Sequence, residues 1–347
     1  METLWKFKTT EKFNVLKVAT LFNQTGLRVI VGGEDGIIRI YDLFTTSGDV
    51  KPQALLETKS GPIQSLGVHD VTKFYDQDLI VADSWGMLTI FCNHQIISRQ
   101  KLSDSSLNHL QICSDQSGSK SIVSSDDSGL VCGNKVSEEL WKINLNNRTT
   151  IKEPSEQIIV KSLLSVDICD QFSHTSNYVL VADNSEHLHI LHEGSIINVL
   201  KTPGVVVAMC KGWFMNTTAI GYQAPTNREG APAASIQENT QVLLGTESGA
   251  IYLLHNFTIS ADEYARVPQI IVSLNPIHLP EYETDLVICA GYFNSLDVFH
   301  EGRKIGSFPS PDWISTVDTA DIDGDGVTEI VFGCMDNTIQ AVKISVT

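Results

Sequence analysis

Hydrophobic and polar positions alternate over short runs along most of the chain, and Gly, Asp or Asn residues separate the runs. In the clearest unit, 313–347, an alternating run leads through an acidic loop, Asp321–Glu329, to the apolar run Ile330–Phe332. Gly333 and a polar turn then precede a second alternating run, Ile339–Ile344. A period near two in such short runs predicts β-strands rather than helices. The unit therefore predicts three antiparallel strands, and no fourth strand follows it.

The same order of runs recurs along the chain, with polar turns near residues 36, 86, 129, 186, 249, 294 and 337. Their spacing falls around the ~40–50 residues of one four-stranded propeller blade. Gly, Asn and Asp suit these turns because they tolerate positive φ. The sixth of the turns is predicted at residues 293–295. A two-sheet sandwich also alternates strands and turns, but seven units of one internal order favour an all-β, seven-bladed β-propeller. The predicted blades span 11–60, 61–104, 105–150, 158–203, 204–267, 268–311 and 312–347 plus 2–9.

The first residues of the chain supply the strand that the last unit lacks. Residues 2–9 alternate like a strand and resemble the outer strand predicted at Glu139–Ile143. We expect them to complete the seventh blade and close the ring, because closure removes the free sheet edges of an open array. The propeller then uses the whole chain.

Charge and cysteine content restrict the classes of partner and compartment. The chain of 347 residues has a net charge of −17, which argues against nucleic acid and anionic membrane surfaces, because both require a basic patch. It leaves room for a basic protein partner. The seven cysteines include no Cys-x-x-Cys pair, and this is typical of buried thiols in a reducing compartment. With no signal peptide or apolar run long enough to span a bilayer, we expect a cytoplasmic protein that is not secreted and that reaches the cilium or nucleus through its partners.

The acidic loop carries the sharpest motif in the sequence, with Asp321, Asp323 and Asp325 at alternate positions and Glu329 four residues later. Alternate carboxylates in a tight loop suit a hard cation such as calcium. The order of acidic loop, apolar strand, Phe-Gly and polar turn resembles the FG-GAP repeat of integrin α-chain propellers. This resemblance implies a calcium loop with Asp321, Asp323, Asp325, the Val327 carbonyl and Glu329 as ligands. The family typically has Asp at the last position, and a turn held by Asx hydrogen bonds without an ion is an equal alternative.

Other motifs for chemistry are weak. His187, His189 and His192 lie close in sequence, but His192 falls on the other face of a strand, so a structural role is favoured over zinc. No phosphate loop, nucleophile elbow or HExxH motif occurs, and the Trp-Asp and Gly-His hallmarks of WD repeats are absent. The innermost strands read as mostly apolar, which opposes a channel-type active site.

We therefore expect a non-catalytic scaffold for protein–protein interactions, since similar intracellular FG-GAP propellers belong to signalling scaffolds and ciliary or vesicle trafficking coats. The expected partners are other protein subunits, not nucleic acid, a membrane interior or a small-molecule substrate. Two alternatives are a propeller enzyme or small-ligand binder using the central channel, and an adhesion module. The long polar segment 216–241 interrupts the repeat pattern, and such segments are functional or disordered. We expect it to contribute to partner docking.

Overall fold

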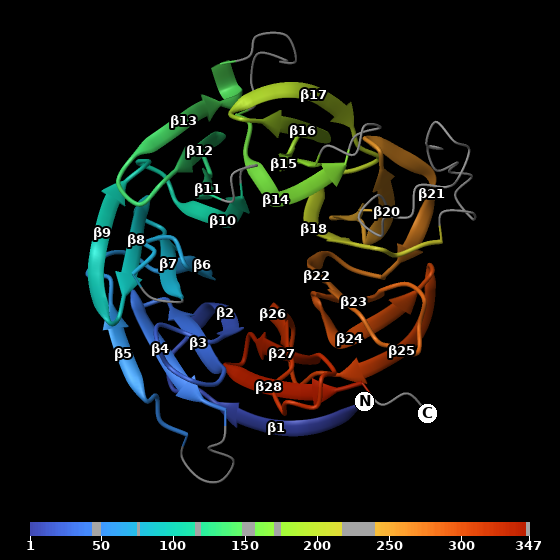
Figure 1. The fold of residues 1–347 in the computed structure, drawn as a ribbon. Coiled ribbons are helices and arrows are strands. Elements are labelled where there is room, and N and C mark those ends of the chain that lie inside the picture. Colours follow the sequence, from blue (N-terminus) through green and yellow to red (C-terminus); the bar gives the residue numbers. More distant parts are fainter. Residues whose placement is uncertain are drawn as a thin grey trace, which may run out of the picture.

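The computed structural model describes residues 1–43, 50–74, 77–114, 119–147, 157–169, 175–216 and 240–344. These residues form 28 β-strands and one short 3-10 turn, Leu145–Asn147. The strands pair into seven four-stranded antiparallel sheets, which stand around a central axis as the blades of a propeller (Figure 1). The predicted seven-bladed β-propeller is confirmed. Within the described ranges, no helix is long and apolar enough to cross a membrane.

We number the blades in chain order and name the strands of each from the axis outwards. Blade 1 contains β2 (Phe13–Ala19), β3 (Arg28–Gly33), β4 (Ile37–Asp42) and β5 (Ala54–Glu57). Blade 2 contains β6 (Ile63–His69), β7 (Asp78–Asp83), β8 (Met87–Cys92) and β9 (Gln95–Lys101), and blade 3 contains β10 (Leu107–Ser114), β11 (Lys120–Asp126), β12 (Leu130–Asn134) and β13 (Glu139–Asn144). Blade 4 contains β14 (Val160–Cys169), β15 (Thr175–Asp183), β16 (His187–His192) and β17 (Ser195–Lys201). Blade 5 contains β18 (Val206–Gly212), β19 (Gln241–Thr246), β20 (Ala250–His255) and β21 (Thr258–Arg266). Blade 6 contains β22 (Ile271–Ile277), β23 (Leu286–Gly291), β24 (Phe293–His300) and β25 (Arg303–Pro309). Blade 7 contains β26 (Ile314–Ala320), β27 (Glu329–Cys334), β28 (Thr338–Lys343) and β1 (Glu2–Lys8).

The ring closes through the N-terminal strand, as predicted. Strand β1 pairs antiparallel with β28, and the register places Trp5 opposite Ala341 and Phe7 opposite Ile339. Figure 1 shows β1 running along the outer side of β28. The Thr9 amide continues the contact by donating to the Asn337 carbonyl at 3.0 Å. First and last strands of the chain therefore share one sheet, so blade 7 has no unpaired outer edge at β28.

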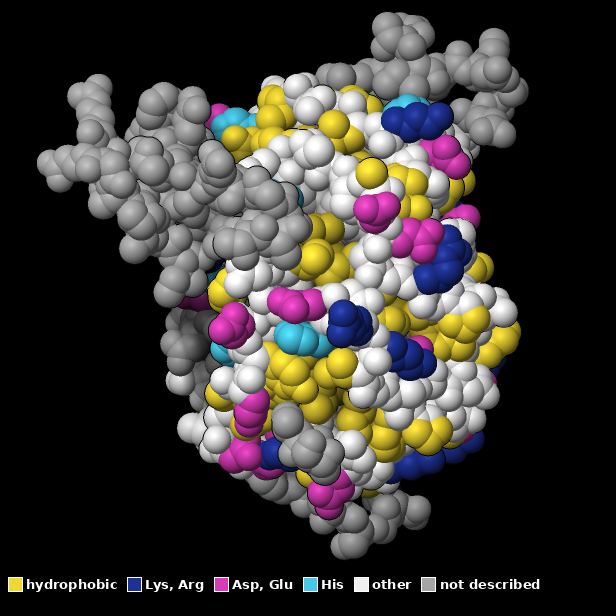
Figure 2. All heavy atoms as spheres, turned by 90° about the vertical axis from the view of Figure 1, so that its right-hand side faces the viewer, with side chains coloured by type: hydrophobic (Ala, Val, Ile, Leu, Met, Phe, Trp, Pro, Cys, Tyr) yellow, Lys and Arg dark blue, Asp and Glu magenta, His cyan; other side chains and the backbone are white. Residues whose placement is uncertain are grey.

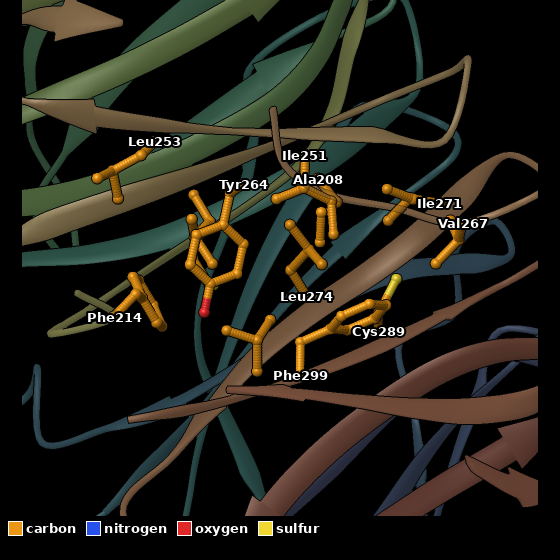
Figure 3. Close-up of a cluster of buried hydrophobic side chains, with 14 of the residues drawn as sticks. Ala208, Phe214, Ile251, Leu253, Tyr264, Val267, Ile271, Leu274, Cys289 and Phe299 are labelled. Carbon is orange, nitrogen blue, oxygen red and sulfur yellow. The ribbon is translucent and has the colours of Figure 1, made fainter. Parts of the chain in front are cut away.

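The hydrophobic core is divided among the contacts between neighbouring blades. Seven clusters of buried side chains each combine residues from two adjacent sheets. In the cluster between blades 5 and 6, Ile251 and Ala208 face Leu274, Ile271 and Phe299 (Figure 3). Every sheet is thus covered on both faces, and this explains why the second strands read as continuous apolar runs instead of strict alternations.

The turns between second and third strands follow the predicted chemistry in five blades, with positive φ at Gly36, Gly86, Gly129, Gly249 and Asn337. In blade 4 the residue with positive φ is Glu186 instead. The predicted sixth turn at 293–295 was wrong, because β24 already begins at Phe293 and leaves Tyr292 alone between the strands. The chain that enters blade 6 lies close to this connection, because the Ile270 carbonyl would be 2.1 Å from a Cβ on Gly291. Glycine permits this close backbone approach, which shortens the connection.

The six cysteines whose side chains are described are buried thiols, as expected. Cys92, Cys113, Cys132, Cys210, Cys289 and Cys334 are all buried and free of disulfide bonds. Burial raises the pKa of the Cys132 thiol to about 12 and that of Cys334 to about 11. The thiolate is the reactive form of cysteine, so these side chains pack as small hydrophobic groups.

Candidate functional site

One face of the ring is built from the same two positions in every blade. We call the first residue after the second strand the turn position, and the residue directly before the innermost strand the entry position. In each blade the amide of the turn position donates to the carbonyl of the entry position over 2.9–3.1 Å. The seven pairs are Glu34–Lys12, Ser84–Pro62, Asp127–Ser106, Asn184–Ile159, Glu247–Val205, Tyr292–Ile270 and Met335–Trp313. This regular bond holds the two positions side by side on what we call the turn face.

Blades 6 and 7 differ from the others at the turn position. The turn position is polar in blades 1 to 5 (Glu34, Ser84, Asp127, Asn184 and Glu247) and becomes Tyr292 and Met335 in blades 6 and 7. The entry positions of these two blades, Ile270 and Trp313, are apolar as well. The exposed fractions are 38% for Ile270, 42% for Tyr292, 46% for Trp313 and 58% for Met335.

These four side chains form one continuous strip, which we call the apolar arc. The backbone bonds join Ile270 to Tyr292 and Trp313 to Met335, and the rings of Tyr292 and Trp313 lie 5.2 Å apart at an interplanar angle of 33°. The Asp312 carboxylate accepts the Trp313 amide at 2.8 Å, so a negative charge borders the arc. Contiguous exposed aromatic groups with a polar border are typical of protein–protein contact sites.

The arc escaped the sequence interpretation. Its residues lie far apart in sequence and in two blades, and no local motif connects them. The signal that finds them is a comparison of the repeats with one another, because the turn position changes from polar to apolar only in blades 6 and 7.

The acidic loop connects β26 to β27 and brings the predicted carboxylates together. One carboxylate oxygen from each of Asp321, Asp323 and Asp325 lies within 4.8 Å of the others. The Asp321 carboxylate accepts the amides of Gly324 and Gly326 at 2.8 and 2.9 Å. These bonds shape the turn that aims the carboxylates inward. Glu329 is completely buried at the start of β27, where its Oε2 accepts the Ile322 amide at 2.8 Å.

A cationic side chain lies against this loop, which the sequence interpretation missed. The Lys343 Nζ, on β28, is 2.7 Å from Asp323, 2.5 Å from Asp325 and 3.2 Å from Glu329. Hydrogen bonds to Asp323 and Asp325 raise the pKa of Lys343, and the bond from Lys343 lowers the pKa of Asp325. The carboxylate oxygens suit calcium as a donor set. One ammonium group already occupies the space between three of the four carboxylates, so the loop as a whole does not fit the calcium site that the resemblance implies.

The three histidines do not converge on a metal. His189 is buried and its Nε2 lies 2.8 Å from the Asp183 carboxylate. His187 contacts the Ser185 hydroxyl, and His192 contacts the Asn177 carbonyl. Although burial opposes ionisation of Asp183, its bonds from His189 and Ser185 prevail and lower its pKa. Each of the three histidines therefore has a structural partner of its own.

Polar groups on the innermost strands link blades to one another. The prediction of mostly apolar strands overlooked Lys17, whose Nζ is 3.1 Å from Asp318 of blade 7. Asp318 also accepts the Val18 amide at 2.7 Å, and Asn14 donates to the Ile63 carbonyl of blade 2 at 2.9 Å. Burial lowers the pKa of His109 on β10 to about 4, so its imidazole is neutral. The polar pairs near the axis thus join neighbouring blades.

A groove on the outer side of the ring lies between blades 5 and 6. It has a volume of about 560 Å³ and an apolar floor that includes Leu253 and Tyr264. Figure 2 views the rim that carries β21 and β25, where apolar side chains lie among acidic and basic ones. Glu263 of the groove is paired with Arg266 at 2.5 Å.

The predicted docking segment 216–241 lies mostly outside the described residues, which omit 217–239. Its two ends are joined by Gln241, which is completely buried. The Gln241 Oε1 accepts the amides of Phe214 and Met215, each at 2.9 Å, and its Nε2 donates to the Met215 carbonyl at 2.8 Å. Blade 5 therefore holds both ends of the insertion by side-chain contacts.

Comparisons with known proteins support the fold. No family model and no curated protein matches the chain by sequence. The crystal structure of BBS1N in complex with ARL6DN, soaked with mercury, has a TM-score of 0.65 at 10% identity, covering 99% of this chain and 97% of that one. The WD40 β-propeller domain of Doa1 also has a TM-score of 0.65, at 12% identity, covering 99% and 98%. At such low identity the similarity demonstrates a shared propeller fold.

Proposed function

We propose that the protein is a non-catalytic scaffold for protein–protein interactions, acting as a subunit of an intracellular multiprotein complex in signalling or in ciliary or vesicle trafficking. The apolar arc on the turn face is the observation that carries this proposal. It exposes two aromatic rings, an isoleucine and a methionine where five other blades have polar turn positions. Water contact with such a strip is unfavourable, and a partner that covers it gains roughly 25 cal/mol per Å² of apolar surface.

The chemistry of the arc indicates the kind of partner segment. An aliphatic or aromatic side chain would pack against Tyr292 and Trp313, whose rings already contact each other. Asp312 beside the arc and the net charge of −17 favour a segment with Lys or Arg next to its apolar residues. Opposite charge also accelerates association and makes it sensitive to salt.

The fold and its similar structures agree with this role. BBS1N, a propeller of similar architecture, is crystallised with ARL6DN as a second protein. In the present chain, the contacts of Lys17 with Asp318 and of Asn14 with the Ile63 carbonyl join neighbouring blades near the axis. We further propose a cytoplasmic location, with the cilium or nucleus reached through partners, and we retain segment 216–241 as a second docking element.

The proposal is tested by the native size of the protein in a cell extract. We expect tagged protein to elute well above the size of one 347-residue chain and to shift toward that size at high salt, because electrostatic attraction is screened. Mass spectrometry of the large fraction then identifies the partners. Elution as a lone monomer in low-salt extract would contradict the scaffold function.

A further inference from the structure

We infer that Lys343 is the built-in cation of the acidic loop, and that the loop consequently folds without calcium. A metal-binding FG-GAP loop would place its ion among the carboxylates of Asp323, Asp325 and Glu329. In this chain the Lys343 ammonium lies within 2.5–3.2 Å of one oxygen from each of these residues. The same oxygens cannot surround calcium while they hold the ammonium group.

Glu329 makes the position of the cation specific. Its side chain is completely buried, and one oxygen is held by the Ile322 amide at 2.8 Å. The other oxygen, Oε1, is also buried and finds no hydrogen-bond partner of good geometry, but it lies 3.2 Å from the Lys343 Nζ. A buried carboxylate requires a positive charge nearby. Among the described residues, the ammonium group of Lys343 supplies this charge to Glu329.

The fold keeps this cation permanently next to the loop. Lys343 is the last residue of β28, whose ladder with β27 pairs Val342 with Ile330. The ammonium group is therefore attached to β28, which pairs with the strand that starts directly after the loop. An intramolecular partner has a high effective concentration, and calcium would have to displace it. The remaining loop bonds are internal, since Asp323 and Asp325 also accept the amides of Asp325 and Val327.

The chain offers a matched control for this inference. Lys304 Nζ donates to the buried carboxylate of Asp297 at 2.7 Å. Asp297 also accepts the hydroxyls of Ser295 and Ser307, and it does not belong to the described carboxylate cluster. Lys304→Met thus removes a comparable lysine–carboxylate bond at a position that calcium cannot fill.

The test compares thermal melting of the full chain and its variants in EDTA and in millimolar calcium chloride. We expect wild type and Lys343→Arg to melt equally in both solutions. Lys343→Met should melt about 3 °C or more below wild type in EDTA and recover at least half of that loss in calcium. The melting temperature of Lys304→Met should be the same in EDTA and in calcium. Calorimetric titration should then detect calcium binding to Lys343→Met and none to wild type.

Three results would overturn the inference. The first is a wild-type melting temperature that rises with calcium or falls with EDTA, and this measurement does not depend on any variant folding. The second is a Lys343→Met protein as stable as wild type in EDTA. The third is an equal response of Lys343→Met and Lys304→Met to calcium, including no response, because the vacated position should accept a cation only in the acidic loop.

Discussion

A chain that begins at Lys12 is expected to melt well below the full-length protein. The deletion removes β1 from β28, and it also removes Leu4, Trp5 and Phe7 from the cluster between blades 7 and 1. The Trp5 and Phe7 rings lie 5.8 Å apart, and Phe7 contacts Tyr41 at 5.2 Å. Both aromatic residues are half-buried, so we expect a loss of about 3–5 kcal/mol from apolar surface.

The lost strand has a second effect, because the deletion exposes the edge of β28 to other chains. We therefore expect both a lower melting temperature and more aggregation on heating. Lys6→Ala is the control, since this exposed side chain lies on the same strand and its removal leaves the pairing intact. Equal melting of the full chain and the chain beginning at Lys12 would disprove ring closure by β1.

Asp126→Ala is expected to cause the second large loss of stability, about 3 kcal/mol or more. Asp126 ends β11 and is 1% exposed. Its carboxylate accepts the amides of Ser128 and Leu130, both at 2.8 Å, and also the hydroxyl groups of Ser103 and Ser128. Alanine leaves these donors without a partner in a tight, buried turn, and such unsatisfied groups are costly.

The neighbouring residue gives the control for this change. Asp127 is exposed, and Asp127→Ala removes the same charge one position along the chain. We expect it to change the free energy of unfolding by less than about 1 kcal/mol. Urea unfolding of both variants separates the two cases, and equal midpoints would show that the Asp126 hydrogen bonds do not stabilise the blade.

Much of the fold could be predicted from sequence because each blade repeats one local pattern. Short apolar runs and turns at Gly36, Gly86 or Gly249 indicate antiparallel strands by themselves, and the recurrence of the unit gives the propeller. The N-terminal strand could be assigned because the last unit lacks a partner for Ile339 and its neighbours. The sixth turn could not be predicted in this way, since its shape depends on how closely the Ile270 carbonyl approaches Gly291.

The candidate sites were harder to predict from the sequence, because they join residues that are distant along the chain. The acidic loop is visible as a motif, but its cation comes from Lys343 on another strand, so the motif alone suggests a metal. The apolar arc combines the entry and turn positions of blades 6 and 7. An exposed Trp313 cannot be distinguished from a core tryptophan until the turn face is assembled.

We expect the apolar arc to bind a protein partner. Affinity purification of tagged protein carrying Tyr292→Ser together with Trp313→Ser tests this directly. The control is Trp85→Ser, because Trp85 is 62% exposed in the turn between β7 and β8 but lies outside the arc. Folding of each protein is checked by thermal melting.

We expect the double variant to melt like wild type and to lose at least about 90% of its co-purified partner, since central aromatic contacts each contribute roughly 2 kcal/mol or more to binding. The Trp85→Ser protein should retain wild-type recovery. Wild-type recovery of every partner by the folded double variant would contradict the account.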